Sequence, residues 1–382
     1  MGLRVLLQCL YYPPEVGGLE SHVAGLGEGL ARHGHYVDML TSRSQPRLKA
    51  KERMAGVNVH RVWMPGKTPL GWMAHTLATL PLNRRLAREA DILHAHTFAS
   101  AVPSLSTVRR YRRPLVLTLH TSHFLMRASK PRWRRIFTRI IRSTDYLLAT
   151  SEEILNVALE IYQHPRSEVM TNAVDTDRFA PRAGREAKGR RRIVVPRRLF
   201  PKNGVEYLVR AMPLIAAELD VEARIVGDGP ERQKLTALAA ELGVAERIEF
   251  LGARSNAEMP ELLCDADLAV IPSLMEATSI AALEAMSCGL PVAASAVGGL
   301  PEIIDGGVGS LFKPADAEAL AGAVIALLER HDLRALGQEG RRRVVENWSI
   351  NRMVERHLEI YNGLLDERQT QAKQDKQIAA ER

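Results

Sequence analysis

The sequence has few of the features that mark secreted, membrane-spanning or metal-binding proteins. Its 382 residues include three cysteines, an odd number without CxxC spacing, which excludes a disulfide framework and a cysteine-based zinc site. No apolar run approaches the roughly 18 residues that a membrane-spanning helix needs. The apolar stretch near the amino end leads into Pro13, Pro14 and Glu15, which do not form a small-residue cleavage site for a signal peptide. Together these absences predict a cytoplasmic protein.

Sequence motifs for metal, triphosphate and dinucleotide binding are absent as well. The chain holds no HExxH sequence, no EF-hand loop and no DxD pair at the end of an expected strand, so we expect neither a metal nor another cofactor. The absence of a Walker sequence argues against a nucleoside triphosphatase. The first apolar run is followed by PPEVGGLES instead of G-x-G-x-x-G, which argues against a dehydrogenase.

The positive charge lies in one half of the chain. Residues 1–180 contain 25 Lys and Arg against 14 Asp and Glu, a net +11, which leaves −3 of the total +8 for residues 181–382. Residues 101–150 carry eleven basic residues and a single acid, Asp145. A basic region of this kind fits nucleic acid or an anionic membrane. No nucleic-acid-binding motif accompanies it, so a nucleic-acid-binding protein is the weaker alternative and we expect no nucleic-acid partner.

Short apolar runs alternate with amphipathic helical patterns along nearly the whole chain. This alternation predicts an α/β protein with parallel sheets covered on both faces, as in two doubly wound, Rossmann-like domains in series. The expected strands are 4–9, 36–40, 57–62, 91–95, 115–119 and 146–149, then 193–195, 223–226, 248–250, 268–271 and 291–294. Helical patterns include 20–32, 131–142, 152–162 and 351–365.

A polar segment with Pro181 and Gly189 separates the two series of strands. We therefore expect one domain over residues 1–175, completed by a carboxyl-terminal helix over about 350–366, and a second domain over 190–348. Residues 367–382 have almost nothing to bury and are expected to form a solvated tail. Ligands of doubly wound sheets bind at the carboxyl ends of strands, so a cleft between two such domains is the expected site.

Two glutamates interrupt an otherwise apolar segment of the second half. Glu276 follows an expected strand, and Glu284 lies within the helix after it. The first backbone N–H groups of this helix offer an anion site. A nucleotide-sugar would use all three features, with its diphosphate at the helix end and a hydroxyl-bearing ring at each carboxylate. A loop residue and a salt bridge are the simpler alternative for two glutamates at this spacing. The residues that begin the helix are Thr278, Ser279 and Ile280.

Seven segments, taken in order, resemble the retaining glycosyltransferases of family 4, which have the GT-B fold of two Rossmann-like domains. They are YYPPEVGGLESHV, DILHAHTFAS, LVLTLHTSH, VMTNAVDTDRF, RRLFPKNGVEYLVRAM, IVGDGPER and the glutamate segment with AMSCGLPV and AVGGLPEII. The resemblance implies metal-independent transfer of a sugar from a UDP- or GDP-linked donor to an acceptor. After Glu276 the chain reads ATSIAA, where the family often has a Gly-Phe-Gly-like run, so the resemblance leaves the sugar open.

The resemblance also implies roles for particular residues. Glu276 would contact hydroxyl groups of the donor sugar, and Glu284 would hold the ribose. Arg197 and Lys202 would stabilise the charge that develops on the departing diphosphate, with Arg198 as the alternative arginine. His120 would lie by the transferred sugar, ahead of the secondary candidates His94, His96 and His123. Gly17, Gly18, Gly227, Gly229 and Asn172 are the further positions expected to bind substrate.

No carboxylate nucleophile is evident at a suitable place in the sequence. We therefore expect the departing phosphate to accept the proton of the incoming hydroxyl while both substrates occupy one face of the sugar. The resemblance implies a sugar, lipid-linked or small-molecule acceptor, and a role in making cell-envelope polysaccharide, glycolipid or a related glycoconjugate. The main alternative is a sugar-nucleotide epimerase with the GT-B fold, which would act on a similar donor without an acceptor.

One helical pattern in the basic region combines apolar and cationic positions. Apolar residues recur at helical spacings among five arginines, so the helix could lie on the inner face of an anionic plasma membrane. The same apolar stripe could pack on the sheet of the first domain and leave the arginines solvated. The apolar positions are Trp133, Ile136, Phe137, Ile140 and Ile141.

Overall fold

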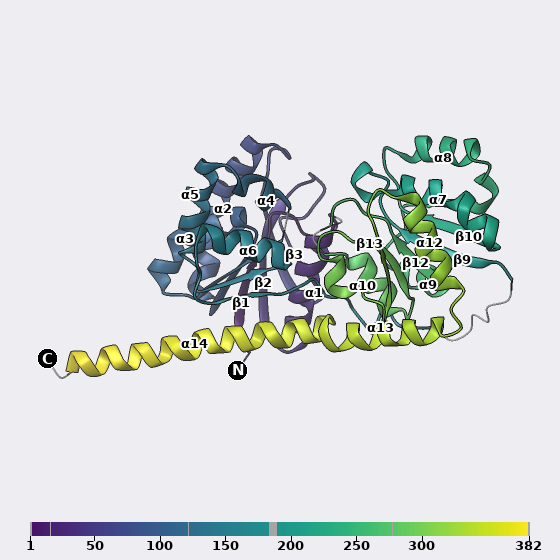
Figure 1. Ribbon diagram of the computed structural model, residues 1–382. Coiled ribbons are helices and arrows are strands. Elements are labelled where there is room, and N and C mark those ends of the chain that lie inside the picture. Colours follow the sequence, from purple (N-terminus) through teal and green to yellow (C-terminus); the bar gives the residue numbers. More distant parts are fainter. Residues whose placement is uncertain (1, 16, 121, 183–188, 277, 381–382) are drawn as a thin grey trace. The chain divides into compact units, whose positions relative to one another are not determined.

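The computed structural model describes residues 2–380 except 16, 121, 183–188 and 277. The chain divides into two compact units, shown in Figure 1: a first unit of residues 1–171 and 350–382, and a second unit of residues 172–349. Much of the polar linker, and the side chain of His123, lie outside the described part. No helix within that part combines the length and the apolar character needed to cross a bilayer.

The first unit is built on one sheet with the strand order β3-β4-β2-β1-β5-β6-β7-β8, counted over the described residues. Its strands pair in parallel except β3, which runs antiparallel to β4 at the sheet edge. The strands are β1 (Arg4–Gln8), β2 (Tyr36–Arg43), β3 (Lys51–Met54), β4 (Val57–Trp63), β5 (Ile92–His96), β6 (Leu115–Leu119), β7 (Tyr146–Ala149) and β8 (Ser167–Val169). The helices are α1 (Gly18–Arg32), α2 (Pro69–Glu89), α3 (Phe98–Tyr111), α4 (Ser122–Ala128), α5 (Pro131–Ile141), α6 (Glu152–Ile161) and α14 (Ile350–Ala380).

The second unit is built on a fully parallel sheet with the strand order β11-β10-β9-β12-β13-β14. Its strands are β9 (Arg191–Pro196), β10 (Val221–Val226), β11 (Ile248–Gly252), β12 (Leu268–Ile271), β13 (Val292–Ser295) and β14 (Gly309–Phe312). Its helices are α7 (Val205–Glu218), α8 (Arg232–Glu241), α9 (Met259–Cys264), α10 (Ile280–Ser287), α11 (Leu300–Ile303), α12 (Ala317–Leu328) and α13 (Leu333–Asn347), with 3-10 turns η1 (Pro201–Asn203) and η2 (Ala245–Arg247).

The central strands are buried on both faces, which is why they read as unbroken apolar runs in the sequence. All five residues of β6 and all four of β12 are buried. Polar side chains begin several helices by accepting a backbone N–H, as Ser151 does for α6 and Asp316 for α12. These caps fix where the helices that connect parallel strands begin. Ligands of such sheets bind beyond the carboxyl ends of the strands, near these helix starts.

Helix α14 returns the end of the chain to the first unit, where Figure 1 shows it as one continuous helix. Its first turns pack on glycines of α1: a Cβ added to Gly25 would lie 2.8 Å from Ile350 Cδ1, and one added to Gly29 would lie 2.5 Å from Val354 Cγ2. The side chain of Tyr361 is fully buried. Close packing of this first half therefore makes α14 a part of the first unit's core.

The helix continues beyond residue 365, where the sequence predicted its end. Arg368 forms an ion pair with Asp145, with 2.9 Å between Nη2 and Oδ1, and Glu367 pairs with Arg166. These contacts fix one further turn against the first unit. The residues after Arg368 are helical to Ala380 and mostly exposed.

The amphipathic helix expected over 131–142 forms as α5, but its apolar stripe is covered by protein. Phe137, Ile140 and Ile141 are buried, and the Phe137 ring lies 5.0 Å from the ring of Phe98 between centroids. Trp133 packs on the same two rings. Ile136 is the exception and is exposed. The membrane-binding role that the sequence analysis considered for this stripe is therefore wrong, because the apolar residues pack inside the first unit.

Candidate active site

The second unit changes winding direction between its first strand and β12. The chain leaves β9 toward β10 and β11 on one side, and later returns to place β12 on the other side of β9, paired at Ile193 and Leu268. Doubly wound sheets bind ligands at this kind of switch point, beyond the carboxyl ends of the two strands. The segments that follow these strands are 197–204 and 272–279, which contain six of the predicted site residues.

The two switch-point segments are joined through their backbones. Leu274 N–H donates to the carbonyl oxygen of Lys202 at 2.8 Å. Gly204 has φ of +64°, and a Cβ at this position would lie 1.9 Å from the carbonyl oxygen of Pro272. Only glycine fits both the backbone conformation and the close approach. The backbone alone therefore fixes the spacing of the two segments.

Arg197 and Glu276 lie together at the centre of this switch point. Arg197 Nη2 donates to Glu276 Oε2 and to Ser279 Oγ, each at 2.7 Å. The two charged side chains are 11% and 18% exposed. Arg197 Nε is buried and has no hydrogen-bond partner among the described residues. Arg197 thus contacts the start of α10, and its Nε–H group remains available to a ligand at a site that is largely shielded from solvent.

Ser279 links this pair to helix α10. The helix begins at Ile280, and the Ser279 side chain caps it by accepting the N–H of Ala282 at 3.3 Å. Thr278 and Ser279 are both buried. A helix start beside an arginine is a favourable place for phosphate oxygens, because backbone N–H groups and a guanidinium can donate to the same anion.

Glu284 lies on α10 close enough to Arg197 to be influenced by its charge. Burial raises the pKa of Glu284 to about 7, and the positive charges of Arg178 and Arg197 oppose the rise. A carboxylate held in this state gains from hydroxyl donors, which replace the water that it has lost. The structure therefore brings three sequence-predicted residues, Arg197, Glu276 and Glu284, into one neighbourhood.

Substitution of Glu284 by glutamine is expected to make the second unit less sensitive to rising pH. The folded pKa lies above the ordinary value of 4.5, so wild type loses stability as the pH rises from about 4.5 to about 7. Glutamine cannot ionise, so the variant should gain up to about 3 kcal/mol relative to wild type between pH 4 and pH 8. Denaturant unfolding across this range measures the difference. Glu241→Gln, at an exposed position, is the control, and an equal gain in that variant would contradict the assignment.

The two predicted glycines after β10 support the arginine segment. A Cβ on Gly227 would lie 2.1 Å from the carbonyl oxygen of Arg197, and one on Gly229 would lie 2.4 Å from that of Leu199. Leu199 N–H also donates to the carbonyl oxygen of Asp228 at 3.0 Å. These contacts give both glycines a packing role directly behind the segment that carries Arg197.

The other two predicted cations face solvent. Lys202, in η1, and Arg198 are exposed, and neither has an acidic side chain within 4 Å in the described part of the chain. Arg198 lies over the ring of Phe200, with 5.7 Å from Cζ to the centroid. Of the two candidate arginines, Arg197 is therefore the one that contacts the predicted carboxylate.

One glycine that contacts the Glu276 segment was not assigned a role from the sequence. Gly298 has φ of +53°, and a Cβ there would lie 1.6 Å from the carbonyl oxygen of Glu276. This glycine lies in the AVGG segment that carried part of the family resemblance, so the sequence held a signal for its importance. Its contact with Glu276 joins residues far apart in the chain, which sequence spacing does not show.

Among the described residues, no hydrogen bond or ion pair links Asn172 to the residues of this site. It is buried, and its Oδ1 atom has no hydrogen-bond partner within the described ranges. Its side chain is therefore available for an additional hydrogen bond. Its expected substrate-binding role stays a prediction.

In the first unit, Gly17 and Gly18 mark the start of α1. Gly17 is the residue before the helix, and its carbonyl oxygen accepts the N–H of Ser21 at 3.0 Å. The segment between β1 and α1 follows the carboxyl end of β1, which lies between β2 and β5 in the sheet. This is the switch point of the first unit, the position at which such sheets bind ligands.

His120 belongs to a histidine cluster made of His22, His94, His96, His120 and His357, all buried. His96 Nδ1 lies 3.1 Å from His120 Nε2, so one ring donates and the other accepts. His94 is held by Tyr361 OH at 2.6 Å and Thr118 Oγ1 at 2.7 Å. Burial and the neighbouring histidines hold the pKa values of His94, His96 and His120 well below the ordinary 6.5. These three rings are therefore neutral at pH 7.

Neutral imidazoles are also the form that binds metals. In the described part of the chain, one nitrogen from each of His22, His96 and His120 lies within 4.8 Å of the others. These three nitrogens are close enough together to coordinate one metal ion. The sequence analysis did not foresee the group, because its members come from three separate segments.

The architecture of both units defines the GT-B fold of two Rossmann-like domains. The structure is similar over 96% of this chain to sucrose-phosphate synthase from Thermosynechococcus elongatus, with a TM-score of 0.82, 22% identity and all of that chain covered. It is similar to Anabaena HepE in complex with UDP and glucose, with a TM-score of 0.74, 20% identity, and 94% of this chain and 99% of that chain covered. The predicted fold class is confirmed.

Sequence comparison identifies the family. The family model "Glycosyltransferase Family 4" matches residues 16–178, and "Glycosyl transferases group 1" matches residues 177–344. The chain is 30% identical to D-inositol 3-phosphate glycosyltransferase from Salinispora arenicola, over 91% of this chain and 87% of that protein. The chain belongs to glycosyltransferase family 4 and is a glycosyltransferase.

Proposed function

We propose that this enzyme transfers a sugar from a UDP- or GDP-linked donor to an acceptor hydroxyl with retention of anomeric configuration. The observation that carries the proposal is the contact of Arg197 with both Glu276 and the start of α10, beside Glu284. A diphosphate at the helix start, a ribose at Glu284 and a sugar at Glu276 would satisfy all three groups. The complex of Anabaena HepE with UDP and glucose supports a nucleotide donor of this kind.

The proposed reaction needs no protein nucleophile. The bond between the anomeric carbon and the diphosphate oxygen breaks, and the acceptor oxygen bonds to the same face of that carbon. The proton of the acceptor hydroxyl passes to the departing phosphate. Arg197 and Lys202 offset the negative charge that grows on the diphosphate, which lowers the barrier because this charge is larger in the transition state. The catalytic assignment of His120 rests on the family resemblance.

The acceptor is proposed to be a sugar, a lipid-linked sugar or a small molecule used in cell-envelope polysaccharide, glycolipid or related glycoconjugate synthesis. We also propose a cytoplasmic enzyme whose first unit contacts an anionic membrane. The net charge of +11 over residues 1–180 supports this contact. Since α5 buries its apolar stripe, the contact requires a different surface.

The test of this proposal is the product formed from a panel of UDP- and GDP-sugars with candidate acceptors. The preferred donor is found first by thermal shift, because a ligand that binds the folded state raises its stability. We expect the product's anomeric configuration, measured by NMR, to match that of the donor, and the rate to persist in excess EDTA. An inverted product would rule out the mechanism, and an epimerised sugar nucleotide formed without acceptor would favour an epimerase.

The EDTA arm also tests the expected metal independence. If EDTA abolished activity and a divalent cation restored it, metal analysis of wild type and of His96→Ala would show whether the three histidines hold the ion. Activity that is unchanged by EDTA, with no bound metal, agrees with neutralisation of the diphosphate by protein cations.

A further inference from the structure

Helix α2 exposes a stripe that continues from apolar to cationic residues along one face. Leu70, Met73 and Leu77 are 77%, 63% and 66% exposed. Their spacing of three and four residues places them on one side of the helix, and the same spacing continues through Pro81 to Arg84 and Arg88. All of these positions are exposed. The exposed stripe of α2 comprises Leu70, Met73, Leu77, Pro81, Arg84 and Arg88.

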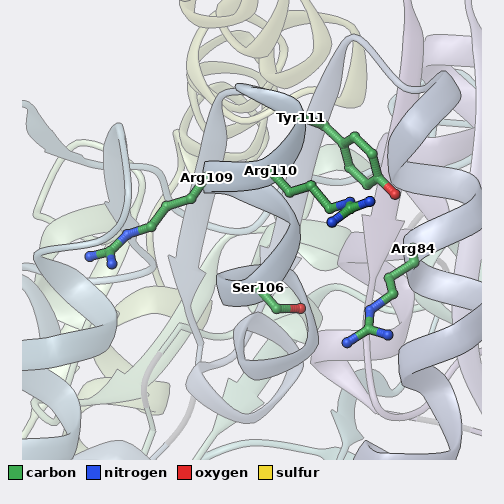
Figure 2. A pocket seen from close by; sticks show the side chains of 5 residues that line it. All are labelled: Arg84, Ser106, Arg109, Arg110 and Tyr111. Carbon is green, nitrogen blue, oxygen red and sulfur yellow. The ribbon is translucent and has the colours of Figure 1, made fainter.

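The cationic end of this stripe borders a pocket shared with α3. The pocket has a volume of about 690 Å³ and is lined by residues of both helices. Figure 2 shows Arg84 of α2 facing Ser106 and Arg110 of α3, while Arg109 points to the other side of α3. The two helices are held together by Asn83 Nδ2, which donates to the carbonyl oxygen of Pro103 at 2.9 Å. The lining residues are Arg84, Ser106, Arg109, Arg110 and Tyr111.

In the part of the chain that the structure describes, no acidic side chain pairs with the cations around this pocket. Nearby acids are already engaged: Glu89 pairs with Arg4, and Asp91 with Arg113. Among the described residues, no carboxylate lies within 4 Å of the five guanidinium groups at the end of α2 and α3. These belong to Arg84, Arg85, Arg88, Arg109 and Arg110. Five positive charges without an acidic partner in the described part of the chain, beside an exposed apolar stripe, suit an anionic partner that also accepts apolar side chains.

We propose that the first unit binds an anionic lipid bilayer through the exposed stripe of α2 and the pocket lined by Arg84, Arg109 and Arg110. The inference deepens the membrane contact of the proposed function and rests on it. The apolar residues of α2 enter the boundary between headgroups and acyl chains, and the arginines bind lipid phosphates. The exposed Trp63, which ends β4, lies on the chain segment before α2 and has the amphipathic ring favoured at this depth.

A second copy of the chain fits this surface less well than a bilayer does. A twofold contact would present the same patch from both partners. That patch supplies cations and apolar groups but no carboxylate to pair with the five arginines. A bilayer that contains anionic lipids supplies both the apolar layer and the negative charge, so it is the occupant that the residues favour.

The experiment measures binding of the full-length protein to vesicles by flotation. Vesicles of phosphatidylcholine alone are compared with vesicles that also contain phosphatidylglycerol, at low and high salt. Wild type is expected to bind the anionic vesicles and to be released in part by salt, through screening. Each basic residue near such a surface contributes about fivefold to partitioning, so an Arg84→Gln, Arg109→Gln, Arg110→Gln variant should bind roughly a hundredfold more weakly.

The apolar part is tested by a Leu70→Gln, Met73→Gln, Leu77→Gln variant. It should bind about tenfold or more weakly, and salt should release nearly all that remains. The matched control for charge is Arg132→Gln, Arg135→Gln, Arg139→Gln on α5, where three exposed arginines are removed from the same unit. The matched control for apolar surface is Met126→Gln with Ile136→Gln, two exposed apolar residues elsewhere in the unit.

Three outcomes would overturn the proposal. The first is that wild type does not float with the anionic vesicles at low salt. The second is that the α5 control loses as much binding as the Arg84→Gln, Arg109→Gln, Arg110→Gln variant. The third is that the apolar variant changes a dimer to a monomer in light scattering while vesicle binding is unchanged. Thermal stabilisation by UDP or GDP is measured on every variant. A variant that binds nucleotide as wild type does is folded, so loss of vesicle binding is then separate from failure of the proposed transfer reaction.

Discussion

Replacement of Arg197 by alanine is expected to lower kcat by about two to three orders of magnitude, the loss typical when a preorganised donor to a developing anion is removed. The side chain contacts Glu276 and Ser279 and has a buried Nε donor without a partner among the described residues, which the proposed diphosphate would use. Steady-state kinetics with the preferred donor measures the loss. Arg197→Lys keeps the charge but not the fork of donors, so it should recover only part of the rate.

Arg198→Ala is the matched control, since it removes the neighbouring arginine, which is exposed and lies over Phe200. A loss of no more than a few-fold is expected there. A larger loss in Arg198→Ala than in Arg197→Ala would give Arg198 the role at the diphosphate. Thermal unfolding of each variant measures how much stability is lost with the Arg197–Glu276 ion pair. A fall in kcat without a matching fall in stability is then a loss of catalysis.

Substitution of Gly298 by alanine is expected to displace Glu276 and to destabilise the second unit by roughly 2–3 kcal/mol. An added methyl group would lie 1.6 Å from the carbonyl oxygen of Glu276, and the backbone has a positive φ that alanine adopts with strain. Activity should fall more than tenfold because Glu276 then moves away from the proposed position of the donor sugar. Denaturant unfolding and kinetics together measure the effect.

Gly306→Ala serves as the control for this substitution. A Cβ on Gly306 meets nothing within 4 Å, and stability should change by less than about 0.5 kcal/mol. If Gly298→Ala had wild-type kinetics, the close approach of these two segments would not matter for the position of Glu276.

The fold follows from patterns that the sequence displays directly. Buried strands such as Leu115–Leu119 and Leu268–Ile271 were predicted with their observed ends, because an apolar run in a parallel sheet has a sharp boundary on both sides. The edge strand β3 (Lys51–Met54) was missed, since its charged residues and partial exposure give no apolar run. Pairing with β4 makes it a strand, and pairing is a tertiary property.

The candidate site was predicted less completely than the fold. The sequence indicated Arg197 and Glu276 separately, but their 2.7 Å contact depends on β9 and β12 lying side by side, which their separation in the chain conceals. The α5 stripe was ambiguous for another reason. An amphipathic pattern shows that one face of a helix is covered, but it cannot distinguish protein from lipid.

The return of α14 to the first unit also bears on how the protein is made. The second unit is one continuous stretch, residues 172–349, whereas the first unit needs residues from both ends of the chain. His357 and Tyr361, which complete the buried contacts around His94, are synthesised after the whole of the second unit. The second unit can therefore reach its final fold while the first unit still lacks part of its core. The unit whose synthesis begins first is therefore the one whose fold is completed last.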